Sequence, residues 1–313
     1  MTGAPMKIRT ISYPIDSQHA FLSAERFLRE EGFSHSILVD LKRQEDAILL
    51  DGCSIPARTL MPEGSCLTVR IADSAPPSLI VPTPMDLSIL YEDEDIMVLN
   101  KPAGLPVHPS MGHWDDTLAN GLSWYFKENG EDFVFRAISR LDRDTTGLVM
   151  IAKHIASACL LSRQAANGLI EKEYLAAACG CIPEFDTIDV PIRRVNDSVI
   201  ERTADPLEGD PARTHYSRLF YDPVSDLSLA RVRLETGRTH QIRVHFLYIG
   251  HPLPGDFLYH PDFSRISRQA LHSWKLHFFH PITKVPMHMN APMPDDMKSL
   301  FPSYSDTHLS PLG

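Results

Sequence analysis

The sequence RAISRLDRDTTGLVMIAK, residues 136–153, joins a highly charged segment to a hydrophobic strand. Asp142 lies between Arg140 and Arg143, Asp144 follows, and a Thr-Thr-Gly turn leads into the apolar run. Two acids at a turn could simply accept hydrogen bonds from backbone amides, but such a turn does not need arginines. A carboxylate that takes part in chemistry must stay ionised, and a nearby permanent cation favours the ionised form. The stretch therefore indicates a reactive acid at the entrance of a core strand.

The segment DRDTT also fits the D-x-D-x-T loop of magnesium-dependent phosphotransferases that use an aspartate nucleophile. Those enzymes place a buried strand before the first aspartate, whereas here the hydrophobic strand follows it. The acids of PDDM, residues 294–297, would have to complete the metal site, and they lie beside a proline near the C-terminus. We therefore disfavour this interpretation. The five cysteines form no C-x-x-C pair, and we predict no metal site.

The composition is that of an ordinary globular protein with excess negative charge. The 313 residues are 43% hydrophobic and 22% charged, with a net charge of −10, and the length allows two domains. No apolar run approaches the ~20 residues of a membrane span, and the first residues lack the apolar core of a signal peptide. We therefore expect a cytoplasmic protein that does not contact a membrane. Nucleic acid would have to bind through a local basic groove, not through the overall field.

Residues 1–75 have a pattern of their own. Two predicted helices, the first capped by Ser23, precede a hairpin at Asp51-Gly52 and an alternating closing strand. This order resembles the αL-type RNA-binding domain of ribosomal small-subunit protein four. We therefore assign this segment as a small αL-type RNA-binding domain, in which Lys42 and Arg43 are the basic residues of the second helix.

A proline-rich linker, residues 76–87, separates this unit from a larger domain over residues 88–300, which a tail over residues 301–313 follows. The larger domain mixes predicted strands (IMVLN, LVMIAK, EYLAAACG, SLARVRL and IRVHF) with helices near 116–127 and 155–168. Strands with interspersed helices in this order predict an α+β fold rather than a regular parallel array.

Three more stretches place polar residues beside predicted strands. VLNKPAGLPVHPS ends a strand at Lys101 and continues into a turn that carries His108, and KEYLA opens a strand with Tyr174. Each of these, taken alone, also fits a rigid turn or a core aromatic residue. ETGRTHQIRVHF, residues 235–246, contains two arginines and two histidines. Interpreted as a strand, it places its histidines on opposite faces, which argues against a zinc pair.

Taken in order, these stretches resemble the RluA-type RNA pseudouridine synthases, in the branch with an N-terminal αL-type domain. The matching strings are LNKPAGLPVHP, SRLDRDTTGLVMIAK, KEYLA, TGRTHQIRVH, GHPLPGD and LHSWKLHFFHP. The resemblance implies an α+β catalytic domain with a central mixed, mainly antiparallel sheet. It also implies an enzyme that breaks the bond from the base nitrogen to ribose carbon 1′ of a uridine in RNA, rotates the base and rejoins it through carbon 5. Such a reaction requires neither a cofactor nor a metal.

The same resemblance assigns roles to four residues. Asp142 is the catalytic acid, either as a nucleophile toward the ribose or as the base that removes its 2′ proton. Arg243 pairs with this acid. Tyr174 packs on the uracil and accepts the carbon-5 proton, and Arg140 enters the space that the flipped uridine leaves in its stack.

The positive charges near these strings predict where RNA binds. We expect a basic groove formed by Lys101, Arg136, Arg140, Arg143, Arg238 and Arg243. The predicted RNA-binding residues are Arg140, Arg143, Lys101, His108, Arg238, Thr145 and Thr146. Ser139 stands where the family commonly has histidine, which weakens any inference about the target. We expect a monomer that acts on ribosomal or transfer RNA; the alternative is a catalytically silent RNA-binding protein on the same fold.

Overall fold

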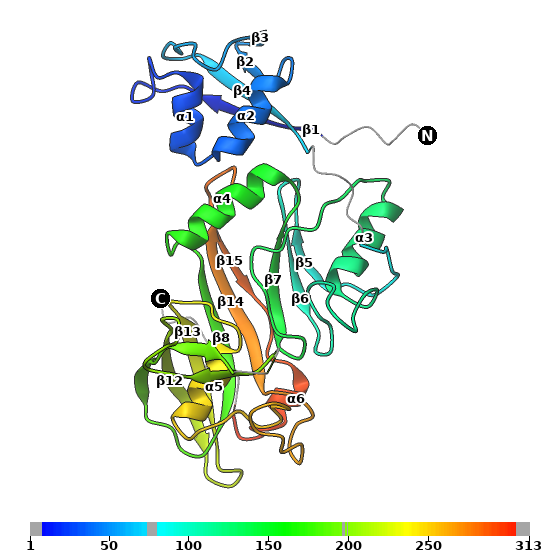
Figure 1. The fold of residues 1–313 in the computed structure, drawn as a ribbon, viewed down its shortest axis with the longest axis vertical. Helices are drawn as coiled ribbons and strands as arrows, with labels where there is room; N and C mark the ends of the chain where they lie inside the picture. Colours follow the sequence, from blue (N-terminus) through cyan, green and yellow to red (C-terminus); the bar gives the residue numbers. More distant parts are fainter. Residues whose placement is uncertain (1–7, 74–79, 196–197, 199, 305–313) are drawn as a thin grey trace.

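The computed structural model describes residues 8–73, 80–195, 198 and 200–304. Part of the predicted linker (76–79) and most of the predicted tail (305–313) lie outside the described residues. Within the described ranges the chain forms a small N-terminal unit and a larger domain built on one long sheet (Figure 1). None of the described helices combines the length and the apolar character that crossing a bilayer would require.

The N-terminal unit packs two helices on an antiparallel sheet of order β1-β4-β2-β3. Its elements are β1 (Ile8–Pro14), α1 (Ala24–Glu31), α2 (His35–Arg43), β2 (Ile48–Leu50), β3 (Cys53–Ser54) and β4 (Cys66–Ala72). The predicted cap and hairpin are confirmed: Ser23 accepts a hydrogen bond from the backbone amide of Arg26, and Asp51 and Gly52 both adopt positive φ in the turn. β1 was not predicted, because only its distant pairing with β4 makes it a strand. The architecture is consistent with an αL-type domain.

The N-terminal unit shares a hydrophobic core with α4 (Ile155–Ala166) of the larger domain. Ala156 and Leu160 of α4 belong to the same buried cluster as Phe27 and Leu38 of the N-terminal helices. In Figure 1, α4 lies between the N-terminal unit and one end of the long sheet. The N-terminal unit therefore packs directly on the domain that carries the predicted site.

The long sheet has the strand order β5-β6-β7-β14-β8-β13-β12-β9, with β15 paired to β14. Its strands are β5 (Ile89–Glu92), β6 (Ile96–Lys101), β7 (Thr146–Ala152), β8 (Glu171–Cys179), β9 (Phe185–Asp189), β12 (Arg213–Asp222), β13 (Leu227–Leu234), β14 (Leu271–Phe279) and β15 (Pro286–Asn290). The pair β7–β14 is parallel and the other pairs are antiparallel. The predicted α+β class with a mixed, mainly antiparallel sheet is confirmed.

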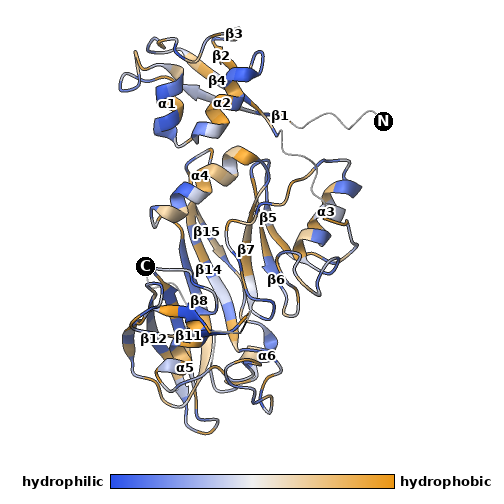
Figure 2. Ribbon diagram, viewed as in Figure 1, coloured by the Kyte–Doolittle hydropathy of each residue, from blue (hydrophilic) through white to orange (hydrophobic). Residues whose placement is uncertain are grey.

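The remaining described elements pack on the faces of this sheet or lie beside it. They are α3 (Leu118–Glu128), α5 (Gln241–Tyr248), α6 (Asp295–Lys298) and the two-stranded ribbon of β10 (Ile192–Arg194) and β11 (Arg202–Ala204). Hydrophobic residues concentrate on β7, whereas α1 is largely hydrophilic (Figure 2). All seven residues of β7 are buried, as expected of a central strand.

The segment IRVHF was predicted as a strand, and this prediction is wrong because the residues lie in α5. Its β-branched Ile242 and Val244 favour a strand locally, but a short apolar run fits a buried helix equally well. His240 adopts the left-handed conformation with φ 60° immediately before the helix. The side-chain oxygen of Gln241 accepts hydrogen bonds from the backbone amide of Arg238 and the hydroxyl of Thr236. These interactions end the preceding turn and start a helix.

The Thr-Thr-Gly turn before β7 allows two strands to approach closely. Gly147 has a φ of 105°, and a Cβ atom at this position would lie 2.1 Å from the carbonyl oxygen of Ser273 in β14. A residue other than glycine would therefore separate the parallel pair of β7 and β14. This contact fixes the loop that carries Asp142 against the centre of the sheet.

Candidate active site

Asp142 lies in the loop that leads into β7. The amide of Thr145 donates to the carbonyl oxygen of Asp142 at 3.1 Å, which closes a tight turn. Beneath the turn, Gln269 donates to the hydroxyl of Thr145, and the hydroxyl of Thr146 lies 2.8 Å from Nδ1 of His272. The loop is thus held by hydrogen bonds on its inner side, which leaves its outer side to carry the carboxylate.

Lys101 supports the same loop from below, which corrects its predicted place in a basic groove. Its side chain is 1% exposed, and Nζ donates to the carbonyl oxygens of Pro102, Leu105 and Arg143 at 2.8, 2.8 and 2.7 Å. Burial lowers the pKa of Lys101 to about 7, partly opposed by the charge of Asp144. The three carbonyl oxygens take the three protons of an ammonium group, so this lysine joins two loops and is closed to RNA.

Arg243, on the first turn of α5, provides the cation that Asp142 needs. Nη1 of Arg243 lies 3.0 Å from Oδ2 of Asp142, while Nε and Nη2 each donate to Asp256 at 2.7 Å. The arginine side chain is 1% exposed and that of Asp142 is 26% exposed. Burial opposes the charge of Arg243, but the bonds to Asp256 and the charge of Asp142 outweigh it and raise the pKa of Arg243. The guanidinium of Arg243 is therefore held by Asp256 in a fixed position beneath Asp142.

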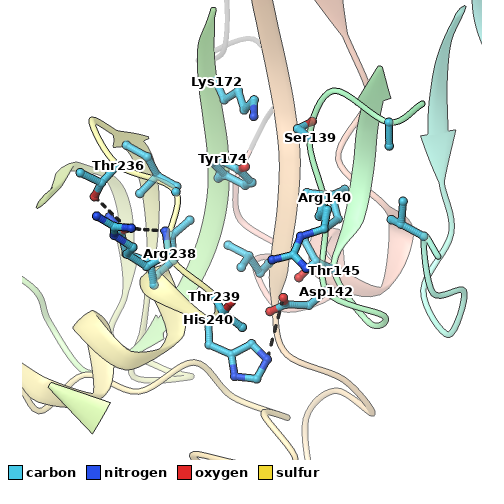
Figure 3. A pocket seen from close by; sticks show the side chains of 18 of the residues that line it. Ser139, Arg140, Asp142, Thr145, Lys172, Tyr174, Thr236, Arg238, Thr239 and His240 are labelled. Carbon is cyan, nitrogen blue, oxygen red and sulfur yellow. Dashed lines mark hydrogen bonds and ion pairs between the residues drawn. The ribbon is translucent and has the colours of Figure 1, made fainter. Parts of the chain in front are cut away.

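The carboxylate of Asp142 opens into a cavity of about 670 Å³ above the centre of the sheet. Tyr174 and Lys172 both project from β8 toward this space, because residues two apart share one face of a strand (Figure 3). Tyr174 is buried, and burial, followed by the negative charge of Asp142, raises the pKa of its phenol. Burial lowers the pKa of Lys172 to about 8. The cavity thus has an acid on one wall and an aromatic ring on another.

The cavity collects most of the predicted site residues but not all of them. Its lining includes Asp142, Tyr174, Arg243, Arg140, His108, Arg238 and Thr145. Thr146 is buried and bonded to His272, so it does not face this space. Arg143 also lies outside the lining and pairs with Asp144 at 2.9 Å. The acid of the opening stretch is thus paired not with its neighbouring arginines but with one 101 residues away.

The predicted basic groove is smaller than expected and differently composed. Arg136 pairs with Asp73 at 2.7 Å, and Lys101, Arg143 and Arg243 are engaged as described above. Three cations line the cavity without an acidic partner among the described residues: Arg140, Lys172 and Arg238. Figure 3 shows Arg140 entering from the loop before β7, Lys172 from β8, and Arg238 from the segment before α5.

His240 is a further neighbour of the acid, and sequence reasoning considered it only as half of a disfavoured zinc pair. Its Nε2 lies 3.9 Å from Oδ1 of Asp142, and its Nδ1 lies 2.9 Å from the hydroxyl of Tyr259. Burial lowers the pKa of His240 to about 4, although Asp142 opposes this effect. The imidazole is therefore neutral at pH 7 and adds no charge beside the acid. Its positive φ places strain next to the site, which is common where a side chain must be held in position.

Sequence reasoning also missed Lys172 and Asp256, although signals for both were present. Lys172 stands two residues before Tyr174 in KEYLA, so the period of a strand already puts it on the same face. Asp256 closes the string GHPLPGD, which was matched but given no role. Its partnership with Arg243 depends on a fold that brings α5 and this loop together.

The acids of this site do not form a metal centre of the type that DRDTT suggested. Across the described residues, the side chains close enough to hold a cation are Asp93, Asp95 and His280, which lie outside the cavity. Arg9 and Tyr91 already donate hydrogen bonds to the two carboxylates of that group. Asp296 of PDDM pairs with Arg268.

Comparison with known proteins places this fold and cavity in one class. Residues 95–248 match the family described as RNA pseudouridylate synthase. This segment contains Asp142, Tyr174 and Arg243. The structure resembles that of human RNA Pseudouridylate Synthase Domain Containing 1 with a TM-score of 0.57 and 26% identity, covering 72% of this chain and 90% of the human chain. The family match and the similar fold both indicate an RNA pseudouridine synthase.

Curated relatives identify the branch of this class. The "Uncharacterized RNA pseudouridine synthase YjbO" of Bacillus subtilis is 38% identical over 282 residues, covering 89% of this chain and 98% of that protein. The "Ribosomal large subunit pseudouridine synthase D" of Escherichia coli O6:H1 is 39% identical over 233 residues, covering 70% and 71%. The chain belongs to the RluA-type family of RNA pseudouridine synthases.

Proposed function

We propose that this chain converts uridine to pseudouridine in large-subunit ribosomal RNA, with Asp142 as its catalytic residue. The substrate is supported by relatives that are named ribosomal large subunit pseudouridine synthase D. The catalytic role rests on one observation: Asp142 is held by the buried Arg243 and is open to a cavity of about 670 Å³. A cavity of this volume lies in the range of small-ligand sites.

The target uridine must leave its stack before the cavity can receive it, at a cost of a few kcal/mol. In our proposal Arg140 occupies the space that the base vacates, and the ring of Tyr174 provides a stacking surface for the uracil. Asp142 then attacks ribose carbon 1′ or removes the 2′ proton, and the bond to the base nitrogen breaks. The freed uracil turns and carbon 5 bonds to carbon 1′, which releases Asp142 from the ribose or follows return of the 2′ proton. The carbon-5 proton then leaves, and the base nitrogen that left the ribose gains a proton. All atoms of the uridine are retained, apart from exchange of that proton.

Tyr174 is proposed to accept the carbon-5 proton at the last step. A phenol with a raised pKa is protonated at pH 7 and is a poor acceptor in the resting enzyme. Burial is the main cause of the raised pKa and the charge of Asp142 is the second. Asp142 leaves the ribose as a carboxylate when carbon 5 bonds to carbon 1′, so its charge is present again when the carbon-5 proton leaves. Tyr174 therefore needs a hydrogen bond to its phenol oxygen in the RNA complex to act as the acceptor.

The proposal is tested by mapping pseudouridine in ribosomal and transfer RNA from a strain without the gene. The wild-type gene should restore pseudouridine in large-subunit RNA, and Asp142→Asn should not. Asp144→Asn is the matched control, because this acid is two residues away but pairs with Arg143. Equal restoration by wild type and Asp142→Asn would contradict the catalytic assignment. Restoration in transfer RNA alone would contradict the proposed substrate.

We propose that the N-terminal unit adds RNA contacts outside the cavity. Its architecture supports this role, but Lys42 lies 2.6 Å from Glu25 and Arg43 lies 4.0 Å from Asp40. Deleting residues 1–75 would expose the apolar face of α4, so charge variants give a cleaner test. The double variant Lys42→Ala, Arg43→Ala should show a shallower dependence of RNA affinity on salt. Unchanged affinity and slope would reject a role for these cations.

A further inference from the structure

The strongest unexplained surface is a short hairpin at the rim of the cavity, residues 110–116, which we call the rim hairpin. Met111 is 91% exposed and Trp114 is 68% exposed. Large apolar side chains as open as these are costly when they have no partner to cover them. Ser110 belongs both to this hairpin and to the cavity lining. The apolar tip is therefore continuous with the site that receives the uridine.

The rim hairpin is held in a defined shape. The amides of Ser110 and His113 each donate to the other residue's carbonyl oxygen at 2.9 Å, and Gly112 takes a φ of 83° at the tip. Asn120, which is fully buried at the start of α3, donates from its side chain to the carbonyl oxygen of Trp114 at 3.0 Å. Met111 and Trp114 are therefore presented by a fixed backbone, which reduces the entropy that binding would cost.

The charge of the rim hairpin decides which part of an RNA it can contact. Residues 102–126 contain neither lysine nor arginine, and Asp115 and Asp116 follow Trp114 directly. His113 is paired with Asp116 at 2.7 Å. A segment of this kind repels phosphates, and its acids also disfavour an anionic membrane surface. What remains is contact with the flat faces of bases, which an indole ring stacks on regardless of their identity.

Flipping a uridine into the cavity leaves unstacked bases on both of its sides. The cations that line the cavity, Arg140, Lys172 and Arg238, can hold the phosphates of this strand. His108, next to Pro109 and Ser110 in the lining, marks the point at which the strand would pass from the cavity to the rim hairpin. A base beside the target is the part of the strand that meets Trp114 there.

We propose that the rim hairpin binds a single-stranded segment of the substrate RNA, with Trp114 stacked on an unpaired base next to the target uridine and Met111 packed against the same base. This inference rests on the proposed function, since it places the rim hairpin along the path of the flipped strand. It assigns the discrimination between single-stranded and paired RNA around the target to two apolar residues outside the catalytic cavity.

The inference is tested with Trp114→Ala and Met111→Ala in the full-length protein. Leu207→Ala is the matched control, since Leu207 is 93% exposed and lies outside the cavity lining. Binding is measured to a 20-nucleotide oligouridylate and to a blunt RNA duplex of the same length. Trp114→Ala should bind the oligouridylate about 5- to 150-fold more weakly, with an unchanged salt slope and an unchanged affinity for the duplex. Trp114→Phe should recover most of the loss.

Turnover separates this inference from the proposed function. On transcribed large-subunit ribosomal RNA, Trp114→Ala should raise KM more than it lowers kcat, whereas Asp142→Asn should remove turnover. Equal binding of the oligouridylate by wild type and Trp114→Ala would overturn the inference while leaving the role of Asp142 intact. Equal losses on oligouridylate and duplex would also overturn it. A wild-type dimer that Trp114→Ala dissociates in the absence of RNA would assign the rim hairpin to protein contact instead.

Discussion

Two carboxylates of this molecule, Asp142 in the cavity and Asp95 at the junction of the two domains, each form an ion pair with an arginine. The two pairs differ in which partner is buried. At the junction the acid itself is buried, with a side chain 5% exposed, and it accepts hydrogen bonds from Arg9 and lies 2.7 Å from Nε2 of His154. In the cavity the arginine is buried, and it is fixed by a second acid, Asp256.

The difference shows how one kind of ion pair can either join two units of the chain or leave a carboxylate open to a cavity. A carboxylate that is surrounded by donors has no free oxygen face with which to attack a substrate. Arg243 instead donates hydrogen bonds from Nε and Nη2 to Asp256 and from Nη1 to Asp142. One oxygen of Asp142 is thereby anchored while the group remains open to the cavity. Burying the cation rather than the acid makes the acid available.

The largest expected effect comes from exchanging the two acids for asparagine. Asp142→Asn should lower pseudouridine formation by at least about 100-fold, because our proposal assigns the attack on the sugar or its proton to this charge. Asp95→Asn should leave the rate constant of a single turnover within a few-fold of wild type. Single-turnover assays on transcribed ribosomal RNA measure both. A greater loss of rate in Asp95→Asn than in Asp142→Asn would contradict the comparison.

The next effect concerns the buried pair below the cavity. Asp256→Asn leaves the guanidinium of Arg243 with one acid in place of two, and breaking a buried pair typically costs about 3–5 kcal/mol of the free energy of unfolding. Denaturant unfolding in urea measures this loss. Asp296→Asn removes the partner of Arg268, where the acid is 42% exposed, and should cost less. An equal loss of unfolding free energy in Asp256→Asn and Asp296→Asn would show that the burial of Asp256 does not increase its contribution to stability.

A smaller effect is expected at the domain junction. Arg9→Met removes hydrogen bonds to Asp95, and because the arginine is partly exposed we expect a loss of about 1 kcal/mol. Burial opposes the charge of Asp95, but the bonds from His154 and Arg9 outweigh it and lower the pKa of Asp95. The stabilisation is therefore complete above the ordinary value of 3.8 and declines as the pH falls below it. The difference in unfolding free energy between wild type and Asp95→Asn should therefore stay constant down to about pH 4 and shrink as the pH falls further.

The smallest effect involves Lys172 on the cavity wall. Because burial lowers its pKa to about 8, this lysine is charged at pH 7 and largely neutral at pH 9. RNA affinity should decrease over that interval, with a salt slope reduced by about one. Lys172→Arg keeps its charge throughout and should remove this component of the pH dependence. Binding titrations at three salt concentrations test it, and an unchanged pH profile in Lys172→Arg would exclude Lys172 as its source.

The sequence predicted those parts of the site that depend on local order along the chain. Asp142 could be singled out from its neighbours, at a turn before a hydrophobic strand, whereas Tyr174 alone fitted a core aromatic residue and gained a role only through the family resemblance. Their meeting with Arg243 could be expected only through the family resemblance, because Arg243 lies 101 residues from Asp142. The fold class followed in the same way from strings spread over the larger domain.

The errors came from properties that only the assembled chain has. Lys101 was predicted on the surface because lysine usually is, yet three carbonyl oxygens from separate segments surround it. The helix α5 was predicted as a strand because Ile242 and Val244 favour strands locally, whereas His240 and Gln241 start a helix through contacts with distant residues. The period of the strand places Lys172 on the face of Tyr174, but its lack of an acidic partner among the described residues is visible only when its surroundings are known.

The parallel pairing of β7 with β14 has a consequence for biosynthesis. Thr146 bonds to His272, 126 positions later in the chain, and Gly147 permits the contact with Ser273 that fixes the loop of Asp142. A nascent polypeptide leaving the ribosome exposes the acid long before β14 has been translated. Because Leu271 of β14 lines the cavity, the cavity can form only after this strand has emerged, 129 residues after Asp142.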